Sequence, residues 1–257
     1  MAKNNKHTER MAKSDRNVNR AMILLMVGLI AEFYLLMVNN YFVKGAVGQV
    51  LTMMTVLKVL GIAGAALFGA GLVLWFMRKK WTRFAPAAPW FLSIGFFFAV
   101  SSQLMLKIYP QGTTVMCVLV PVAMLLGIVF LLYPREFSLQ ALALTAAMMA
   151  MYLIHRGGGS DTWRGLVIGC SVFAALVIAA LAVAVSKAGK NGGKLEKLGD
   201  LRIVSVDGNY RLIYAVLAVC VAAIVIALFA TSIAYYGLWI LAVGTFLLAV
   251  YYTVKMM

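Results

Sequence analysis

The sequence predicts an all-α integral membrane protein, a polytopic bundle of about eight transmembrane helices. The chain is 64% hydrophobic and 12% charged, whereas an ordinary soluble domain is about 45–50% apolar and 25% charged. Its mean hydropathy is +0.94. Its apolar residues are gathered in runs of about 20 residues, the length that an α-helix needs to cross the hydrocarbon core of a bilayer. Lipid must therefore be part of the solvent of this chain.

The apolar runs divide the chain into candidate spans and polar segments. We expect a basic cytoplasmic tail at 1–20, followed by a single transmembrane domain at 21–257 with a cytoplasmic loop at 187–210. The first run is too long for the apolar region of a cleaved signal, so we expect it to stay as an anchor. Because the fifth run is the shortest, six or seven crossings with one re-entrant segment is the alternative. The predicted spans are 21–43, 50–77, 87–108, 112–133, 137–154, 164–186, 211–231 and 233–254.

Lysine and arginine residues are distributed unequally between the two sides of this array. With the N-terminus inside, the outer side receives only Lys44, Lys107, Arg156 and Arg164. This positive-inside pattern predicts that both termini are cytoplasmic. A plasma membrane, in the simplest case a bacterial cytoplasmic membrane, is the expected location. The cytoplasmic side receives the tail residues and Arg78, Lys79, Lys80, Arg83, Arg135, Lys187, Lys190, Lys194, Lys197, Arg202, Arg211 and Lys255.

Glu32 is the only one of the eight acidic residues expected deep within a span. A bare charge there costs several kcal/mol, so it needs a partner. Lys58 lies in the second span, and Gly45 is at the midpoint between the two residues, so a hairpin turn there would bring them to one depth. Asn39 shares the helix face of Glu32. We expect an intramembrane pair that faces the protein interior, acting either as a structural clip or as a site that couples ions to transport.

The second span also carries small residues at helical spacing. Gly61, Ala65 and Gly69 share a face with Lys58. Small side chains let two helices approach closely in a membrane. We expect this face to pack against a neighbouring helix.

The basic residues of the tail recur every three or four positions. On a helix they would form one stripe that suits anionic lipid headgroups, an acidic partner or RNA. The opposite face has almost no apolar surface, so the tail is not expected to insert into the membrane. Because the segment lacks apolar periodicity, we favour a disordered tail that sets the orientation. The residues are Lys3, Lys6, Arg10, Lys13, Arg16 and Arg20.

The sequence lacks the residue sets that intramembrane enzymes commonly use, such as paired acids, a histidine-rich metal set or a nucleophile beside a base. The two histidines are in the tail and in a loop. Cys117, Cys170 and Cys220 lie in three different spans without a CxxC pair, which indicates packing residues and not a disulfide framework or zinc site. We therefore expect no enzyme, no metal and no cofactor.

The leading functional hypothesis is a non-catalytic structural or assembly subunit, or scaffold, in a membrane complex. The spans are almost purely apolar and small residues are available for helix packing. The expected partners are the lipid bilayer and another membrane protein or a second copy of the chain. Nucleic acid is not expected, because membrane orientation explains the basic residues. The alternative is a small secondary transporter that uses the Glu32–Lys58 pair, with Pro121 as a hinge.

Overall fold

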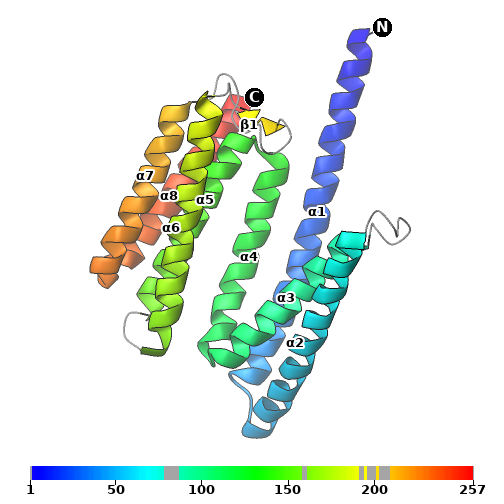
Figure 1. The fold of residues 1–257 in the computed structure, drawn as a ribbon, viewed down its shortest axis with the longest axis vertical. Helices are drawn as coiled ribbons and strands as arrows, with labels where there is room; N and C mark the ends of the chain where they lie inside the picture. The colour runs from blue at the N-terminus through cyan, green and yellow to red at the C-terminus, as the bar shows by residue number, and fades with distance from the viewer. Residues whose placement is uncertain are drawn as a thin grey trace. The chain divides into compact units, whose positions relative to one another are not determined.

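The computed structural model describes residues 2–77, 87–157, 161–190, 194–195, 201–202 and 209–256. Within these residues eight helices are long and apolar enough to cross a membrane, which confirms an all-α polytopic fold (Figure 1). In chain order they are α1 Ala2–Phe42, α2 Val47–Phe76, α3 Ala88–Lys107, α4 Gln111–Leu132, α5 Arg135–Gly157, α6 Asp161–Lys190, α7 Tyr210–Phe229 and α8 Thr231–Met256.

The fifth helix is longer than its apolar run suggested. Arg135–Gly157 contains 23 residues, about 35 Å of helix at 1.5 Å per residue. The extra turns come from polar residues at both ends, Glu136 near the start and His155 near the end. By length, α5 therefore needs no re-entrant geometry.

Helix α1 begins far before its span. It starts at Ala2, so the expectation of a disordered tail is wrong for the backbone of this segment. Residues 2–20 contain neither proline nor glycine and include good helix formers such as alanine, lysine and arginine. A helix that already exists in the membrane extends without a new nucleation step, which is the costly part of helix formation.

A short hairpin lies between α6 and α7. Strand β1, Lys194–Leu195, pairs antiparallel with strand β2, Leu201–Arg202, and Lys194 stands opposite Arg202. In the sequence, Leu201, Ile203 and Val204 followed by Asp207-Gly208 are typical of a short strand and turn. Leu201 lies in β2, whereas positions 203–208 lie outside the described residues.

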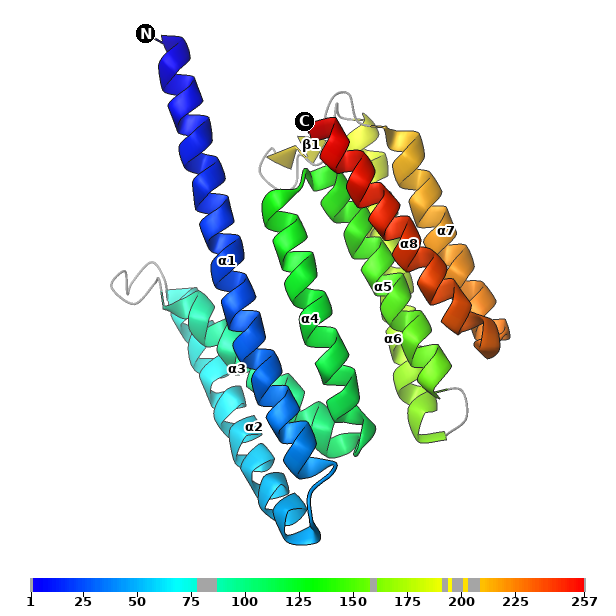
Figure 2. The same ribbon diagram turned by 180° about the vertical axis from the view of Figure 1, so that it is seen from behind.

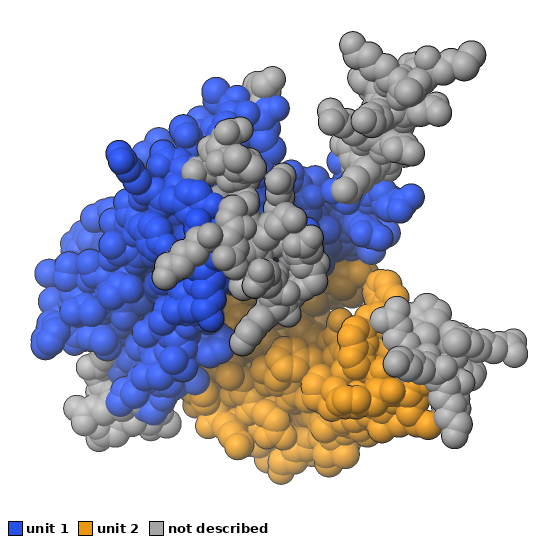
Figure 3. All heavy atoms as spheres, turned by 45° about the horizontal axis from the view of Figure 1, so that its top comes forward, with its two compact units in different colours: residues 1–25, 122–257 blue, residues 26–121 orange. Residues whose placement is uncertain are grey.

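The chain divides into two compact units (Figure 3). Unit 1 contains residues 1–25 and 122–257, and unit 2 contains residues 26–121. The sequence had suggested a single transmembrane domain over 21–257. The division falls inside α1 and inside α4, where Pro121 is the last residue of unit 2.

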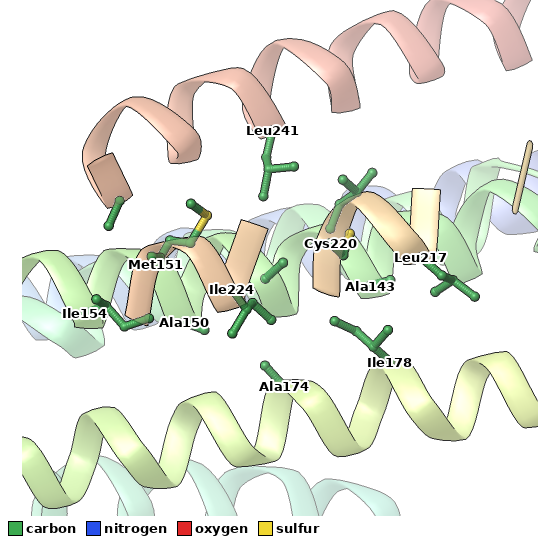
Figure 4. Close-up of a cluster of buried hydrophobic side chains, with 14 of the residues drawn as sticks. Ala143, Ala150, Met151, Ile154, Ala174, Ile178, Leu217, Cys220, Ile224 and Leu241 are labelled. Carbon is green, nitrogen blue, oxygen red and sulfur yellow. The ribbon is translucent and has the colours of Figure 1, made fainter. Parts of the chain in front are cut away.

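Unit 1 is organised around α5. In the most apolar stretch of α5, 61% of the residues are buried, against 28% or fewer in each of the other seven helices. Helices α6, α7 and α8 lie beside it (Figure 2). Small and branched side chains fill the space between them, including Ala150 of α5, Ile178 of α6, Ile224 of α7 and Leu241 of α8 (Figure 4). Most of α5 is therefore shielded from lipid by its neighbours.

Unit 2 is built on close contact between α2 and α3. A Cβ atom added at Gly64 would lie 2.6 Å from the backbone nitrogen of Ala99, and one added at Gly71 would lie 2.8 Å from that of Leu92. Gly95 of α3 lies equally close to the backbone of Phe68. Only glycine permits this approach, because any side chain would displace the neighbouring helix.

A second apolar cluster completes unit 2 and joins all four of its helical segments. Its buried members are Leu35, Val38, Phe42, Leu57, Met105 and Met116. Tyr34 of α1 packs its ring edge-on against Phe97 and Phe98 of α3, with centroids 6.2 and 5.6 Å away. These contacts bury one face of α1 within the unit.

Candidate functional site

Glu32 lies on the inward side of α1 in unit 2. It precedes Leu35 by one turn, and Leu35 is fully buried in the apolar cluster. The side chain is half-buried, and its Oε2 atom is enclosed without a hydrogen-bond partner in the described part of the chain.

Lys58 does not provide the expected counter-charge in this structure. Its neighbour Leu57 is fully buried, whereas Lys58 itself is exposed on α2. No ion pair joins Glu32 and Lys58, both of which belong to the described residues. Phe98 of α3 contacts both Tyr34 of α1 and Gly64 of α2. Glu32, two residues from Tyr34, therefore lies nearer the level of Gly64 than that of Lys58, and Lys58 also faces outward on α2. A long lysine side chain can then reach toward the interface.

The close-packing face of α2 also differs from the predicted one. Gly61 is buried against Ser102 of α3, where an added Cβ would lie 3.2 Å from the Ser102 Cβ. Ala65 is exposed, and an added Cβ at Gly69 would meet nothing within 4 Å. The contact face runs through Gly61, Gly64 and Gly71, so only the first predicted residue belongs to it.

The other residues that the sequence singled out on α1 lie away from Glu32. Asn39 is half-buried two turns further along α1, and its backbone carbonyl accepts a hydrogen bond from Val43. Arg16 and Arg20 are exposed on α1. The side chains of Lys3, Lys6, Arg10 and Lys13 lie outside the described part of the structure, so their lipid contacts stay predictions.

Unit 2 contains further enclosed polar atoms that have no partner within the described residues. They are the hydroxyl oxygens of Tyr34, Ser102 and Thr113. Ser102 and Thr113 are fully buried. The polar interior of unit 2 is therefore larger than the single carboxylate that the sequence singled out.

A second polar cluster lies in unit 1, where α5 begins. The sequence analysis did not predict it. Glu136, in the first turn of α5, is 4% exposed. Gln140, one turn later and fully buried, donates from Nε2 to the Tyr252 hydroxyl of α8 at 3.1 Å. Within the described residues the Gln140 Oε1 atom has no hydrogen-bond partner. The sequence does contain a signal for this cluster, because Glu136 and Gln140 are four residues apart and share one face of an otherwise apolar helix.

The described residues contain no group of three or more His, Cys, Asp and Glu side chains that could hold a metal ion. Cys117, Cys170 and Cys220 are free thiols on three different helices. Two half-buried thiols and one buried thiol are typical of packing residues in apolar surroundings.

No protein-family model, curated protein or solved structure matches the chain. Function must therefore be argued from the two polar clusters and from the packing around them.

Proposed function

We propose that the chain is a non-catalytic structural or assembly subunit, a scaffold in a membrane complex, at the plasma membrane with both termini in the cytoplasm. The observation that carries this proposal is the apolar centre of unit 1. From Ala143 to Ile154 every buried residue of α5 is apolar. At 1.5 Å per residue this stretch is about 17 Å long.

An apolar centre of this length favours a scaffold over a conduit. A solute or ion that moves along α5 would need polar groups or water to replace its hydration shell. The side chains that surround this stretch, among them Ala174, Ile178, Leu217 and Ile224, offer neither (Figure 4). Unit 1 is suited to holding its helices in a fixed arrangement.

The test is native mass spectrometry of the tagged full chain, extracted from its own membrane together with surrounding lipid. We expect the chain to be found with a different protein in a fixed ratio. An unrelated multi-pass protein of similar size, extracted in the same way, identifies proteins that co-extract without specificity. Recovery of the chain alone, or only with copies of itself, would contradict a role as a subunit of a complex of different proteins.

A small secondary transporter is the second candidate, because the enclosed Oε2 of Glu32 has no partner within the described residues. Intramembrane acids in transporters commonly bind the coupling ion. In this reading Glu32 acts without Lys58, which is exposed. Glu32→Gln should then abolish ion flux into proteoliposomes, whereas Lys58→Gln should leave it unchanged. Equal flux in wild type and Glu32→Gln would exclude Glu32 as the coupling residue.

A further inference from the structure

The pair of α2 and α3 has one exposed flank. Gly64 and Gly71 of α2 contact α3, and Gly95 and Ser102 of α3 contact α2. In an antiparallel pair the residues that directly follow the contact residues of both helices lie on the same flank, because both helices turn in the same right-handed sense. These residues are all exposed, as is Lys58, two turns before Ala65. Together they define the α2–α3 flank: Lys58, Ala65 and Leu72 of α2, and Phe96 and Gln103 of α3.

Helix α1 covers the opposite flank of the pair. Phe98, which directly precedes the contact residue Ala99, packs edge-on against Tyr34 of α1 with ring centroids 5.6 Å apart. Glu32, the only acidic residue in the sequence of unit 2, is also on α1. Lysine side chains on the α2–α3 flank therefore have no acidic residue of their own unit beside them.

The polar side chains of the flank gather near the C-terminal end of α3. Three contacts give a constant antiparallel register, which pairs Gly61 with Ser102, Gly64 with Ala99 and Gly71 with Leu92. Continued by one turn, this register places Lys58 level with Met105, between Gln103 and Lys107 of α3. The three polar residues therefore lie within about 6 Å of one another in height.

These side chains are also rooted close together across the two helices. Gln103 and Lys107 are four residues apart on α3, so they are neighbours on its surface. A Cβ atom added at Gly61 would lie 3.8 Å from the Gln103 Nε2 atom, so this amide reaches α2 one turn from Lys58. Lys58 and Lys107 are both exposed. Two flexible ammonium groups and one amide can thus converge on a single anion.

The length of α3 sets the depth of this polar end. Its 20 residues make about 30 Å of helix, the thickness of the hydrocarbon core. Lys107 is its last residue, and Tyr109 follows, with its ring 4.8 Å from that of Phe42. Tyrosine at this position is typical of the membrane interface. The polar end of the flank therefore lies at the level of lipid headgroups, and its apolar remainder lies at the level of the acyl chains.

We propose that the α2–α3 flank binds an anionic phospholipid, whose phosphate lies among Lys58, Gln103 and Lys107. The acyl chain follows the apolar residues of the flank. Lysine binds phosphate as a point charge, and basic residues between transmembrane helices bind anionic headgroups. The site does not depend on the scaffold role, because it belongs to the isolated chain.

The experiment reads lipid contact at one position of the full-length chain, whose native cysteines are replaced by alanine. A bimane label is attached at Ile62→Cys, because Ile62 is exposed on α2 one turn after Lys58. The chain is reconstituted in phosphatidylcholine vesicles that contain a nitroxide-labelled lipid, either phosphatidylglycerol or phosphatidylcholine. Quenching by each gives the relative affinity of the two lipids. We expect phosphatidylglycerol to be preferred by about fivefold or more, and this preference to disappear when Lys58→Gln and Lys107→Gln are combined.

Two matched variants control for charge. The combination of Lys58→Arg and Lys107→Arg should keep the preference, and so should Lys44→Gln, which removes an exposed lysine from the connection between α1 and α2. A label at Phe33→Cys controls for position, because Phe33 is exposed and has no lysine or arginine within four residues. It should report no preference.

Three results would overturn the site. Equal quenching by the two lipids at Ile62→Cys would leave the lysines for an acidic residue of a partner protein. A preference that persists in the combined glutamine variant would show that these lysines do not cause it. An equal preference at Phe33→Cys would show a general attraction of the chain for anionic lipid.

Discussion

The Gln140–Tyr252 contact shows how a buried polar pair acts at the scale of single residues. Both side chains are at most 1% exposed, and one hydrogen bond of 3.1 Å connects them across α5 and α8. The net gain from such a bond is only about 1 kcal/mol. The cost of losing one partner is larger, because the remaining polar atom stays buried beside Phe137 and Ala141.

We predict that Tyr252→Phe and Gln140→Leu each lower the free energy of unfolding by about 1–3 kcal/mol. The double variant should cost less than the sum of the two, since neither side chain is then left without a partner. A double-mutant cycle on reversible unfolding in bicelles measures this difference. Strictly additive losses would mean that the two residues do not interact.

Tyr133→Phe provides the control for this cycle. The Tyr133 hydroxyl lies 3.1 Å from Thr253 Oγ1, but Thr253 also donates to the Ala249 carbonyl at 2.7 Å. Removing the Tyr133 hydroxyl therefore leaves Thr253 satisfied. The expected loss is below about 1 kcal/mol, clearly smaller than that of Tyr252→Phe.

At the scale of elements, the packing of α2 against α3 depends on which face of α2 each glycine occupies. Gly64 of α2 is close to the backbone of Ala99 of α3, whereas nothing lies within 4 Å of an added Cβ at Gly69. The two glycines are on the same helix but on different faces. They therefore separate the effect of helix propensity from the effect of interhelical packing.

We predict that Gly64→Ala destabilises unit 2 by about 1–3 kcal/mol, because the new methyl group must push α3 away. Gly69→Ala should be neutral or stabilising by up to about 1 kcal/mol, since alanine is the better helix former and has open space there. Thermal unfolding of both variants in nanodiscs measures the contrast. Equal midpoints for the two variants would contradict the α2–α3 contact.

The same pair of helices shows what sequence can and cannot predict. Span positions follow from apolar run length, which is why α2, α3 and α7 lie close to their predicted ranges. Helix rotation does not follow from it. Helix α2 has small residues on several faces, and the choice among them depends on Gly95 of α3. The expected Glu32–Lys58 pair is not formed in this structure, because it depends on helix rotation and on the level at which α1 and α2 pack, and neither follows from run length.

At the scale of the whole molecule, the number of crossings determines where the termini lie. Eight helices have the length and composition of spans within the described residues. If all eight cross, Arg16 near the start of the chain and Lys255 near its end lie on one side of the membrane, and Lys44 between α1 and α2 lies on the other. Seven crossings would separate Arg16 from Lys255. The excess of basic residues on one side predicts that this side is the cytoplasm.

We predict the accessibility of three exposed positions, Arg16, Lys44 and Lys255, in a variant whose native cysteines are replaced by alanine. Single cysteines are introduced at each position, and intact cells are treated with a membrane-impermeant thiol reagent. Lys44→Cys should react in intact cells. Arg16→Cys and Lys255→Cys should react only after permeabilisation, because both lie in the predicted cytoplasmic regions. Opposite behaviour of Arg16→Cys and Lys255→Cys would show an odd number of crossings, whereas a complete reversal of all three would keep eight crossings and invert the orientation.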